Sequence, residues 1–235
     1  MLDAQVDLCG ELLEREETFP AIARNDSFRF ACAGCGDCCR GREDIVLSGY
    51  DLFRIARRLS LPPRITAGAF CRQYVGRVTL LPVMRLAPAA GKKRDCPFLY
   101  ENRCSIQEAK PLVCALYPLG QSIGRDGSIE YFLQPTGCGG ELFEARLQDY
   151  LEAMGVAQRE GLDAAWALAC IALSQRMKAL REKSGEPVAR AAQRHAREAL
   201  YLRYDIEKPF EPQFRANLAW LEEKLTRLEG ICRRK

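Results

Sequence analysis

The sequence predicts a mainly α-helical protein with small irregular β content, in which a cysteine-rich module packs on a C-terminal helical bundle. Apolar residues at helical spacing dominate after Glu141, whereas eight of the twelve cysteines lie earlier, in turn-rich sequence. Two short runs, 77–86 and 128–133, have β-like composition. We therefore expect a module over residues 1–140, with an N-terminal helix, and a helical bundle over residues 141–235.

The first half of the chain contains three predicted helices. Residues 3–17 have the spacing of a short amphipathic helix. Ser48, followed three residues later by Asp51, is a capping-box pattern that opens a second helix. Pro62 and Pro63 begin a third, because proline is favoured in the first turn of a helix.

The second half contains four apolar stripes at helical spacing, separated at Gly161, at Gly185 and at residues 209–212. We interpret them as the buried faces of a bundle. The stripes are Phe143, Leu147, Tyr150, Leu151 and Met154; Trp166, Cys170, Leu173, Met177 and Leu180; Val188, Ala192, His195, Ala199 and Leu202; and Phe214, Leu218, Leu221, Leu225 and Leu228.

Eight cysteines have the spacing of metal ligands. The first group, C-A-G-C-G-D-C-C on a glycine-rich loop, contains Cys32, Cys35, Cys38 and Cys39. The second group contains Cys96, Cys104, Cys114 and Cys138, three of them within the turn-rich residues 88–118. Because tight turns point thiolates two residues apart toward one point, we predict that all eight bind metal. This metal is expected to stabilise the module.

The number of sites depends on Cys38 and Cys39. In an extended chain, neighbouring side chains point in opposite directions. The two thiols are then expected to serve different sites, each of four thiolates and each completed from the second group. A single site with spare thiols is the alternative.

The donor set favours iron over zinc. The single histidine, His195, lies on an apolar helical stripe, where packing explains it better than metal binding. All-sulfur sites suit iron–sulfur clusters or structural zinc. C-x2-C-x2-C and the pair Cys96–Pro97 are typical of bacterial ferredoxins, so the expected cofactor is an iron–sulfur cluster, of the 4Fe–4S type before others, with zinc as the alternative.

The remaining four cysteines are expected to have other roles. Cys9 and Cys170 lie on apolar helical faces and are interpreted as core residues. Cys71 and Cys232 lie near predicted helix ends.

Composition limits the compartment and the partners. The longest apolar run, 164–173, is too short to span a membrane, and the N-terminus has no signal-peptide pattern, so we expect a cytoplasmic protein with reduced thiols. The net charge is +4, and basic residues flank the cysteines. Neutralisation of thiolate charge explains them better than nucleic-acid binding. These residues are Arg40, Arg42, Lys92, Lys93, Arg94, Arg103 and Lys110.

The cysteine segment resembles the CxxCxxCC cysteine-cluster family of zinc- or iron-chelating proteins, often described as containing Fe–S clusters. The residues that carry the resemblance are Phe30, Cys32, Cys35–Gly36, Cys38–Cys39–Arg40, Leu47–Ser48, Asp51, Cys96–Pro97–Phe98–Leu99, Cys104–Ser105–Ile106, Pro111–Leu112–Val113–Cys114 and Tyr117–Pro118. The chain departs from the family pattern at Gln107, Lys110 and Ala115. The resemblance implies metal binding, and the family's relatives of flagellin lysine N-methylase imply methyl transfer to protein lysines.

Three functions remain open on the sequence. The first is an electron-transfer or redox protein that carries one or two all-cysteine iron–sulfur clusters and works with a protein partner or an electron donor or acceptor. The second is an enzyme similar to a SAM-dependent protein lysine N-methylase. The third is a protein whose loops are held by zinc and whose bundle binds a partner. Motifs of most hydrolytic enzymes are missing, and the C-x3-C-x2-C spacing of radical-SAM enzymes does not occur.

Overall fold

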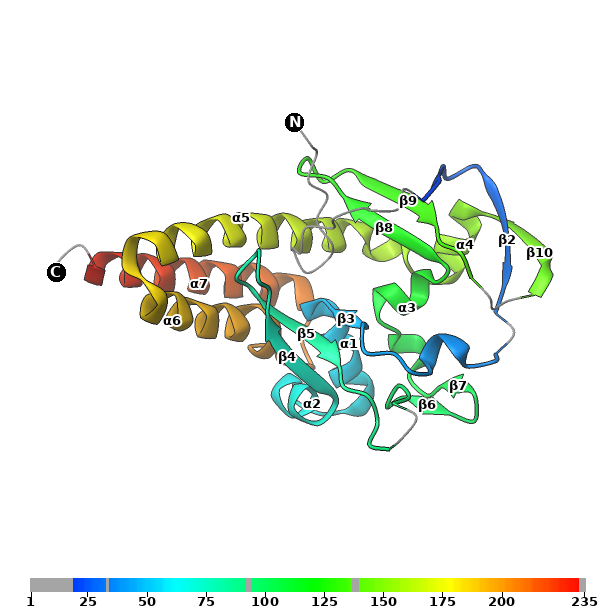
Figure 1. Ribbon diagram of the computed structural model, residues 1–235, viewed down its shortest axis with the longest axis horizontal. Helices are drawn as coiled ribbons and strands as arrows, with labels where there is room; N and C mark the ends of the chain where they lie inside the picture. The colour runs from blue at the N-terminus through cyan, green and yellow to red at the C-terminus, as the bar shows by residue number, and fades with distance from the viewer. Residues whose placement is uncertain (1–18, 33, 92–93, 137–139, 233–235) are drawn as a thin grey trace.

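The computed structural model describes residues 19–32, 34–91, 94–136 and 140–232. About half of the chain is helical and the sheets are small and irregular, as the sequence predicts. The three C-terminal helices, α5 (Glu160–Ser184), α6 (Glu186–Arg197) and α7 (Phe210–Cys232), form one side of the molecule, and the sheets with the shorter helices form the other (Figure 1).

The first group of elements surrounds a three-stranded sheet of order β3-β5-β4. It consists of β3 (Val46–Leu47), α1 (Gly49–Leu59), α2 (Pro63–Phe70), β4 (Cys71–Val75) and β5 (Pro82–Leu86). Both predicted helix starts are confirmed: Ser48 and Asp51 form a complete capping box, and Pro63 is the first residue of α2. The run 77–86 is a strand only from Pro82, because the residues before it form the turn between β4 and β5.

A second sheet, of order β1-β9-β8, and a separate pair of strands combine residues 21–31 with residues 119–146. The strands are β1 (Ala21–Ile22), β2 (Ser27–Ala31), β8 (Leu119–Ile123) and β9 (Ile129–Leu133), and β2 pairs with β10 (Gly140–Arg146). Between the two sheets lie the turn η1 (Asp37–Cys39), the hairpin of β6 (Leu99–Tyr100) and β7 (Arg103–Cys104), the turn η2 (Gln107–Ala109) and α3 (Leu112–Leu116). The expected strand over 128–133 is confirmed as β9.

The prediction that a helix begins near Phe143 is wrong for the first turn of that helix. Residues up to Arg146 belong to β10, and the helix α4 (Leu147–Ala153) starts only after them. The spacing of Phe143 and Leu147 fits a helix, but antiparallel pairing with β2 satisfies the backbone of this segment instead. Leu147 and Leu151 of α4 then pack against side chains of β2 and α3.

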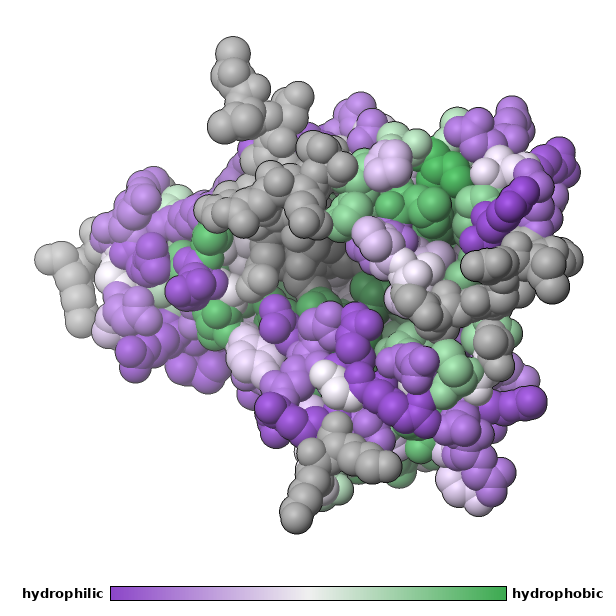
Figure 2. Space-filling view, turned by 45° about the vertical axis from the view of Figure 1, so that its right-hand side comes forward, coloured by the Kyte–Doolittle hydropathy of each residue, from purple (hydrophilic) through white to green (hydrophobic). Residues whose placement is uncertain are grey.

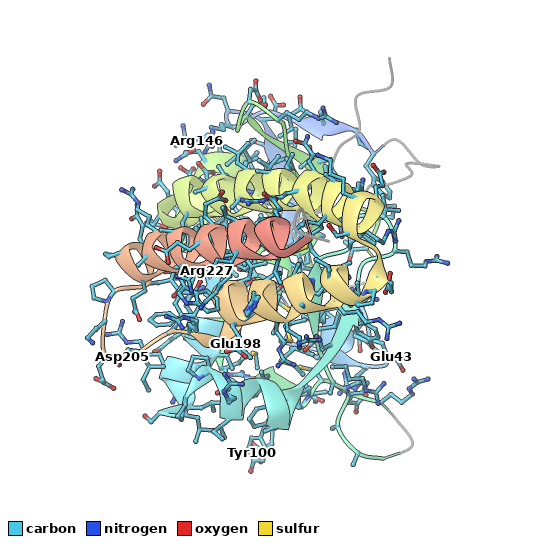
Figure 3. All side chains as sticks on the ribbon, turned by 90° about the vertical axis from the view of Figure 1, so that its left-hand side faces the viewer. Glu43, Tyr100, Arg146, Glu198, Asp205 and Arg227 are labelled. Atoms are coloured by element: carbon cyan, nitrogen blue, oxygen red, sulfur yellow. The ribbon has the colours of Figure 1, made fainter. Side chains whose placement is uncertain are left out.

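The C-terminal helices form the expected bundle. They are α5 (Glu160–Ser184), which follows the turn η3 (Ala157–Arg159), then α6 (Glu186–Arg197) with a π-helical continuation (Glu198–Leu202), and α7 (Phe210–Cys232). The three helices lie side by side (Figure 3). The predicted stripes supply the buried residues, among them Trp166, Met177 and Leu225.

The main hydrophobic core crosses position 140. Leu47, Leu52 and Ile55 from β3 and α1 belong to the same buried cluster as Trp166 and Leu200 from the bundle. The cysteine-bearing loops therefore rest on a surface that both halves of the chain build.

Some expected features lie outside the described residues: the helix over 3–17, Cys9, Lys92–Lys93 and Cys138. Among the helices that are described, none combines the length and the apolar character needed to cross a membrane.

Gly49 provides a test of this packing. A Cβ atom on Gly49 would lie 2.0 Å from the carbonyl oxygen of Leu200 and 2.6 Å from the Trp166 ring. We expect Gly49→Ala to lower the free energy of unfolding by about 1–3 kcal/mol through overpacking, although alanine favours a helix. Urea unfolding followed by circular dichroism measures this change.

Gly68 in α2 is the matched control, because no atom lies within 4 Å of its hypothetical Cβ. Gly68→Ala is expected to stabilise the protein by up to about 1 kcal/mol through helix propensity. Equal effects of the two substitutions would contradict the packing described here.

Candidate metal centre

The first cysteine group lies on a loop between β2 and β3 that turns sharply at Gly36. This residue has φ 75° and lies so close to the β6–β7 hairpin that a Cβ atom would be 3.1 Å from the carbonyl oxygen of Asn102. Only glycine combines this conformation with this approach at low cost. The Cys39 N–H donates to the Gly36 carbonyl oxygen at 2.9 Å and closes the turn η1.

This turn brings the two neighbouring cysteines together. The Sγ atoms of Cys38 and Cys39 lie 3.8 Å apart, and both side chains line the same cavity. The expectation that they point in opposite directions is therefore wrong, because the segment is a 3-10 turn and not an extended chain.

Cys96 and Cys104 are carried by the hairpin and its approach. The Cys96 N–H donates to the Cys39 carbonyl oxygen at 2.7 Å, and their side chains also form a hydrogen bond. Cys104 is the last residue of β7 and pairs with Leu99. The second group is thus attached to the first by main-chain and side-chain contacts.

Arg40 fixes the loop on the hairpin. Its Nη1 donates to the Cys35 carbonyl oxygen at 2.5 Å, and its Nη2 donates to Oδ1 of Asn102 in the hairpin turn. Tyr100, just before this turn, is 68% exposed and points away from the protein (Figure 3). The hairpin therefore presents its sulfurs to the interior and an aromatic ring to solvent.

Cys114 lies on the short helix α3, which is held by a buried carboxylate. Asp51 Oδ1 accepts from the Leu112 N–H at 3.0 Å, at the start of α3, and from Nη1 of Arg159 at 2.8 Å. Asp51 Oδ2 accepts from the Ser48 N–H in the capping box of α1. One carboxylate thus connects α1, α3 and the beginning of the bundle.

Arg159 makes the network larger. It donates to both oxygens of Asp163 at 2.8 and 2.7 Å, and the side chains of Arg159, Asp51 and Asp163 are 4% exposed or less. Burial raises the pKa of Asp163 to about 6, although the Arg159 guanidinium opposes this by stabilising the carboxylate. Burial works to lower the pKa of Arg159, but the two carboxylates outweigh it and raise this pKa, so that Arg159 stays charged.

Five cysteines line one cavity of about 570 Å³ between the two sheets. They are Cys38, Cys39, Cys96, Cys104 and Cys114. Apolar side chains, among them Phe98 and Leu116, make up much of the remaining wall. The space-filling view shows a hollow near the middle of the molecule with apolar residues at its bottom (Figure 2).

The thiols influence one another's protonation. The hydrogen bond with Cys39 raises the pKa of Cys38, and the hydrogen bond with Cys39 lowers the pKa of Cys96. For Cys39 itself, Cys38 lowers the pKa, but the bond with Cys96 and burial raise it to about 11. Of the three hydrogen-bonded thiols, Cys38, Cys39 and Cys96, Cys96 is therefore the one whose pKa is lowered.

Two further thiols and a lysine complete this group. Burial raises the pKa of both Cys104 and Cys114, and the charges of Cys39 and Cys104 raise that of Cys114 further. The ammonium group of Lys110 opposes part of the increase in the pKa of Cys38 and of Cys104. A cation beside the sulfurs favours the thiolate form, which is the form that binds metal.

Cys32 and Cys35, two further predicted ligands, are not among the residues that line this cavity. Cys32 is exposed and Cys35 is half-buried. Burial raises the pKa of Tyr150, and the charges of Cys32 and Cys38 raise it further. In the described ranges, no three side chains of His, Cys, Asp or Glu converge closely enough to hold a single metal ion. The sulfurs surround a space and do not meet at a point.

The residues expected to have structural roles lie in the core, at a helix end and against an aromatic ring. Cys170 is 2% exposed in the core. Cys71 follows the last residue of α2, and burial raises its pKa to about 12. His195 is half-buried with its ring edge against Trp220.

Residues 31–138 match the model of the CxxCxxCC family, which carries the description "Putative zinc- or iron-chelating domain". The cysteine segment is a CxxCxxCC domain. The resemblance stated from the sequence is thereby confirmed, and the domain includes all eight grouped cysteines. Comparison with curated proteins and with solved structures finds no match to the chain.

Sequence reasoning missed the residues that support the CxxCxxCC domain from outside. Arg159 and Asp163 show only the i,i+4 spacing of a helical ion pair, which is common on exposed surfaces. Gln121, which lines the cavity, has no sequence signal at all.

Arg159 offers a direct test of the buried network. Arg159→Met leaves Asp51 and Asp163 buried without a cation, so we expect the free energy of unfolding to fall by about 3–5 kcal/mol. The measurement is urea unfolding at neutral pH.

The control is Arg215→Met. Arg215 pairs with Glu211 on the surface, where the side chains are 77% and 59% exposed, and its loss should cost about 0.5 kcal/mol or less. A cost for Arg159→Met as small as that of the control would show that the network is not structural.

Proposed function

We propose that the CxxCxxCC domain holds an iron–sulfur centre through cysteine thiolates and serves electron transfer or another redox reaction. The observation that carries this proposal is the gathering of cysteines from η1, the hairpin and α3 around one cavity. Thiolates are the protein ligands of iron–sulfur clusters, and an apolar wall around them limits access of solvent.

The inner ligand set that we propose is Cys39, Cys96, Cys104 and Cys114. Cys39 is hydrogen-bonded to Cys96, and the charges of Cys39 and Cys104 act on Cys114. We assign only Cys39 of the vicinal pair to the inner set, because its side chain is bonded to Cys96 of the hairpin, whereas Cys38 acts together with Cys32 on Tyr150.

The outer set that we propose is Cys32, Cys35, Cys38 and Cys138. Cys32 and Cys38 both act on Tyr150, which brings them into one neighbourhood. Because Cys32 is exposed, a centre here is accessible to a protein that donates or accepts electrons. Such a pair of centres, one enclosed and one at the surface, suits a reducing compartment such as the cytoplasm.

The spread of the sulfurs supports a cluster over a zinc ion. Four thiolates on one zinc ion, at about 2.3 Å and in tetrahedral directions, lie about 3.8 Å from one another. In the described part of the chain, no three ligand-type side chains converge closely enough for this. A cluster fits the wider arrangement of the sulfurs, and Lys110 offsets part of its negative charge.

The experiment is metal and sulfide analysis of protein purified without oxygen, together with visible absorption. The proposal predicts iron, acid-labile sulfide and a broad visible absorption that bleaches on reduction. Zinc without iron would instead support a structural role. Calorimetric binding of SAM would favour the methylase-like alternative.

Single serine variants test the ligand sets. Cys39→Ser is expected to remove the enclosed centre and about half of the iron, and Cys38→Ser is expected to remove the other half. Cys71→Ser is the matched control and should keep all of the iron, because Cys71 lies at the end of α2, outside the cavity wall. Loss of all metal in both variants would mean a single site and contradict the division into two sets.

A further inference from the structure

The strand β4 lies at an open edge of its sheet. In the order β3-β5-β4 it pairs with β5 alone among the described strands. Residues 72–75 are all exposed, and Tyr74 and Val75 are each 43% exposed. An open edge presents a row of main-chain N–H and carbonyl groups to which another chain can bind.

The register shows which main-chain groups of β4 point outward. The Gly76 N–H donates to the Leu81 carbonyl oxygen at 2.9 Å, in register with the β4–β5 pairing. Hydrogen-bonded pairs alternate along an antiparallel ladder, so Tyr74 bonds to β5 and its neighbours do not. The N–H and carbonyl groups of Gln73 and Val75 therefore point away from β5.

The other side of β5 agrees with this assignment. The Leu86 N–H donates to the Ile45 carbonyl oxygen at 2.9 Å, so the even-numbered residues of β5 bond to β3 and its odd-numbered residues bond to β4. Val83, an odd-numbered residue, lies opposite Tyr74. Within the described residues, no segment pairs with the outward groups of β4.

The side chains of the same two β4 residues face the bundle. Gln73 Oε1 accepts from Nη1 of Arg197 in α6 at 3.2 Å, and Val75 lines a groove together with Arg190 of the same helix. Side chains that lie opposite each other on paired strands point to the same face of the sheet. A strand added to β4 would therefore direct every second side chain toward α6.

The groove beside Val75 is basic. It lies where the tip of the β4–β5 hairpin reaches α5 and α6, and its wall contains three arginines and one carboxylate (Figure 1). The carboxylate, Glu186, pairs with Arg190 at 3.2 Å. The side chains of Arg77 and Arg181 form no hydrogen bond or ion pair within the described residues. Two positive charges thus line the groove without a partner charge.

We propose that the β4 edge binds an extended acidic segment of a partner protein, which adds to the sheet as a further strand and places its carboxylates on the arginines of the groove. The outward groups of Gln73 and Val75 favour an extended peptide, and Arg77 and Arg181 favour acidic side chains on it. Pairing of two β4 strands from two copies of this chain would instead bring like charges together. The surface goes beyond the metal centre and does not depend on which metal the cysteines hold.

The probe is a fluorescein-labelled Glu-Val-Glu-Val-Glu peptide, and its binding to the full chain, purified anaerobically with its metal, is measured by fluorescence anisotropy. Glutamates on the side of the arginines lie opposite Gln73 and Val75, so their N–H groups face β4. We expect N-methylation of two glutamate nitrogens to weaken binding by about tenfold or more, and N-methylation of the two valine nitrogens, which point to solvent, to weaken it less than about threefold. A Lys-Val-Lys-Val-Lys peptide should not bind.

Val75→Pro tests the edge from the side of the protein. Proline at this position removes an outward N–H and no hydrogen bond to β5, so peptide binding should fall by about tenfold while the strand is retained. Val75→Thr keeps the N–H and is the matched control, with a change of less than about twofold.

Arg77→Gln combined with Arg181→Gln tests the charges of the groove. We expect peptide binding to weaken by about three- to tenfold. The control is Arg215→Gln on the surface of α7, where the side chain is 77% exposed, and it should leave binding unchanged.

The peptides keep the proposal testable even if Val75→Pro does not fold. No saturable binding of the unmodified peptide, or equal weakening by the two kinds of N-methylation, would overturn it. Tighter binding of a fluorescein-labelled oligothymidylate would assign the arginines to phosphate groups, and a dimer in light scattering that Val75→Pro dissociates would assign the edge to a second copy. Metal content, measured on the same samples, separates failure of the metal centre from failure of this surface.

Discussion

The buried carboxylate of Asp51 is the contact on which the rest of the architecture depends. Its two oxygens cap α1 through Ser48, hold the first N–H of α3 at Leu112, and pair with Arg159 at the start of the bundle. Each of these groups would otherwise be a buried donor without a partner. The charges are unequal, with two carboxylates around one guanidinium, and the hydrogen bonds to Asp51 compensate for the difference.

This arrangement explains how loops with little regular structure can position thiols. Cys114 lies two residues after Leu112, so the network that fixes the start of α3 also fixes this sulfur. On the other side of the cavity, Arg40 attaches the first cysteine loop to the hairpin that carries Cys104. The metal-binding segment is thus held from a rigid helical core at one end and by a surface arginine at the other.

The sequence allowed prediction of features that depend on neighbours along the chain. The capping box of Ser48 and Asp51 is local, and so are the apolar stripes of the bundle. Features that depend on distant contacts escaped it. Asp51 and Arg159 are 108 residues apart, β10 is a strand because β2 pairs with it, and the 3-10 turn at Cys38 and Cys39 depends on the close approach of Gly36 to the hairpin.

Native-state hydrogen exchange at the Leu112 amide tests most directly whether Asp51 connects the core to the metal-binding segment. The account predicts that Asp51→Ala removes protection of this amide far more than it affects amides in the middle of α7, because the acceptor of the Leu112 N–H is lost. Unchanged protection of Leu112 in this variant would show that α3 is held by other contacts and would contradict the account.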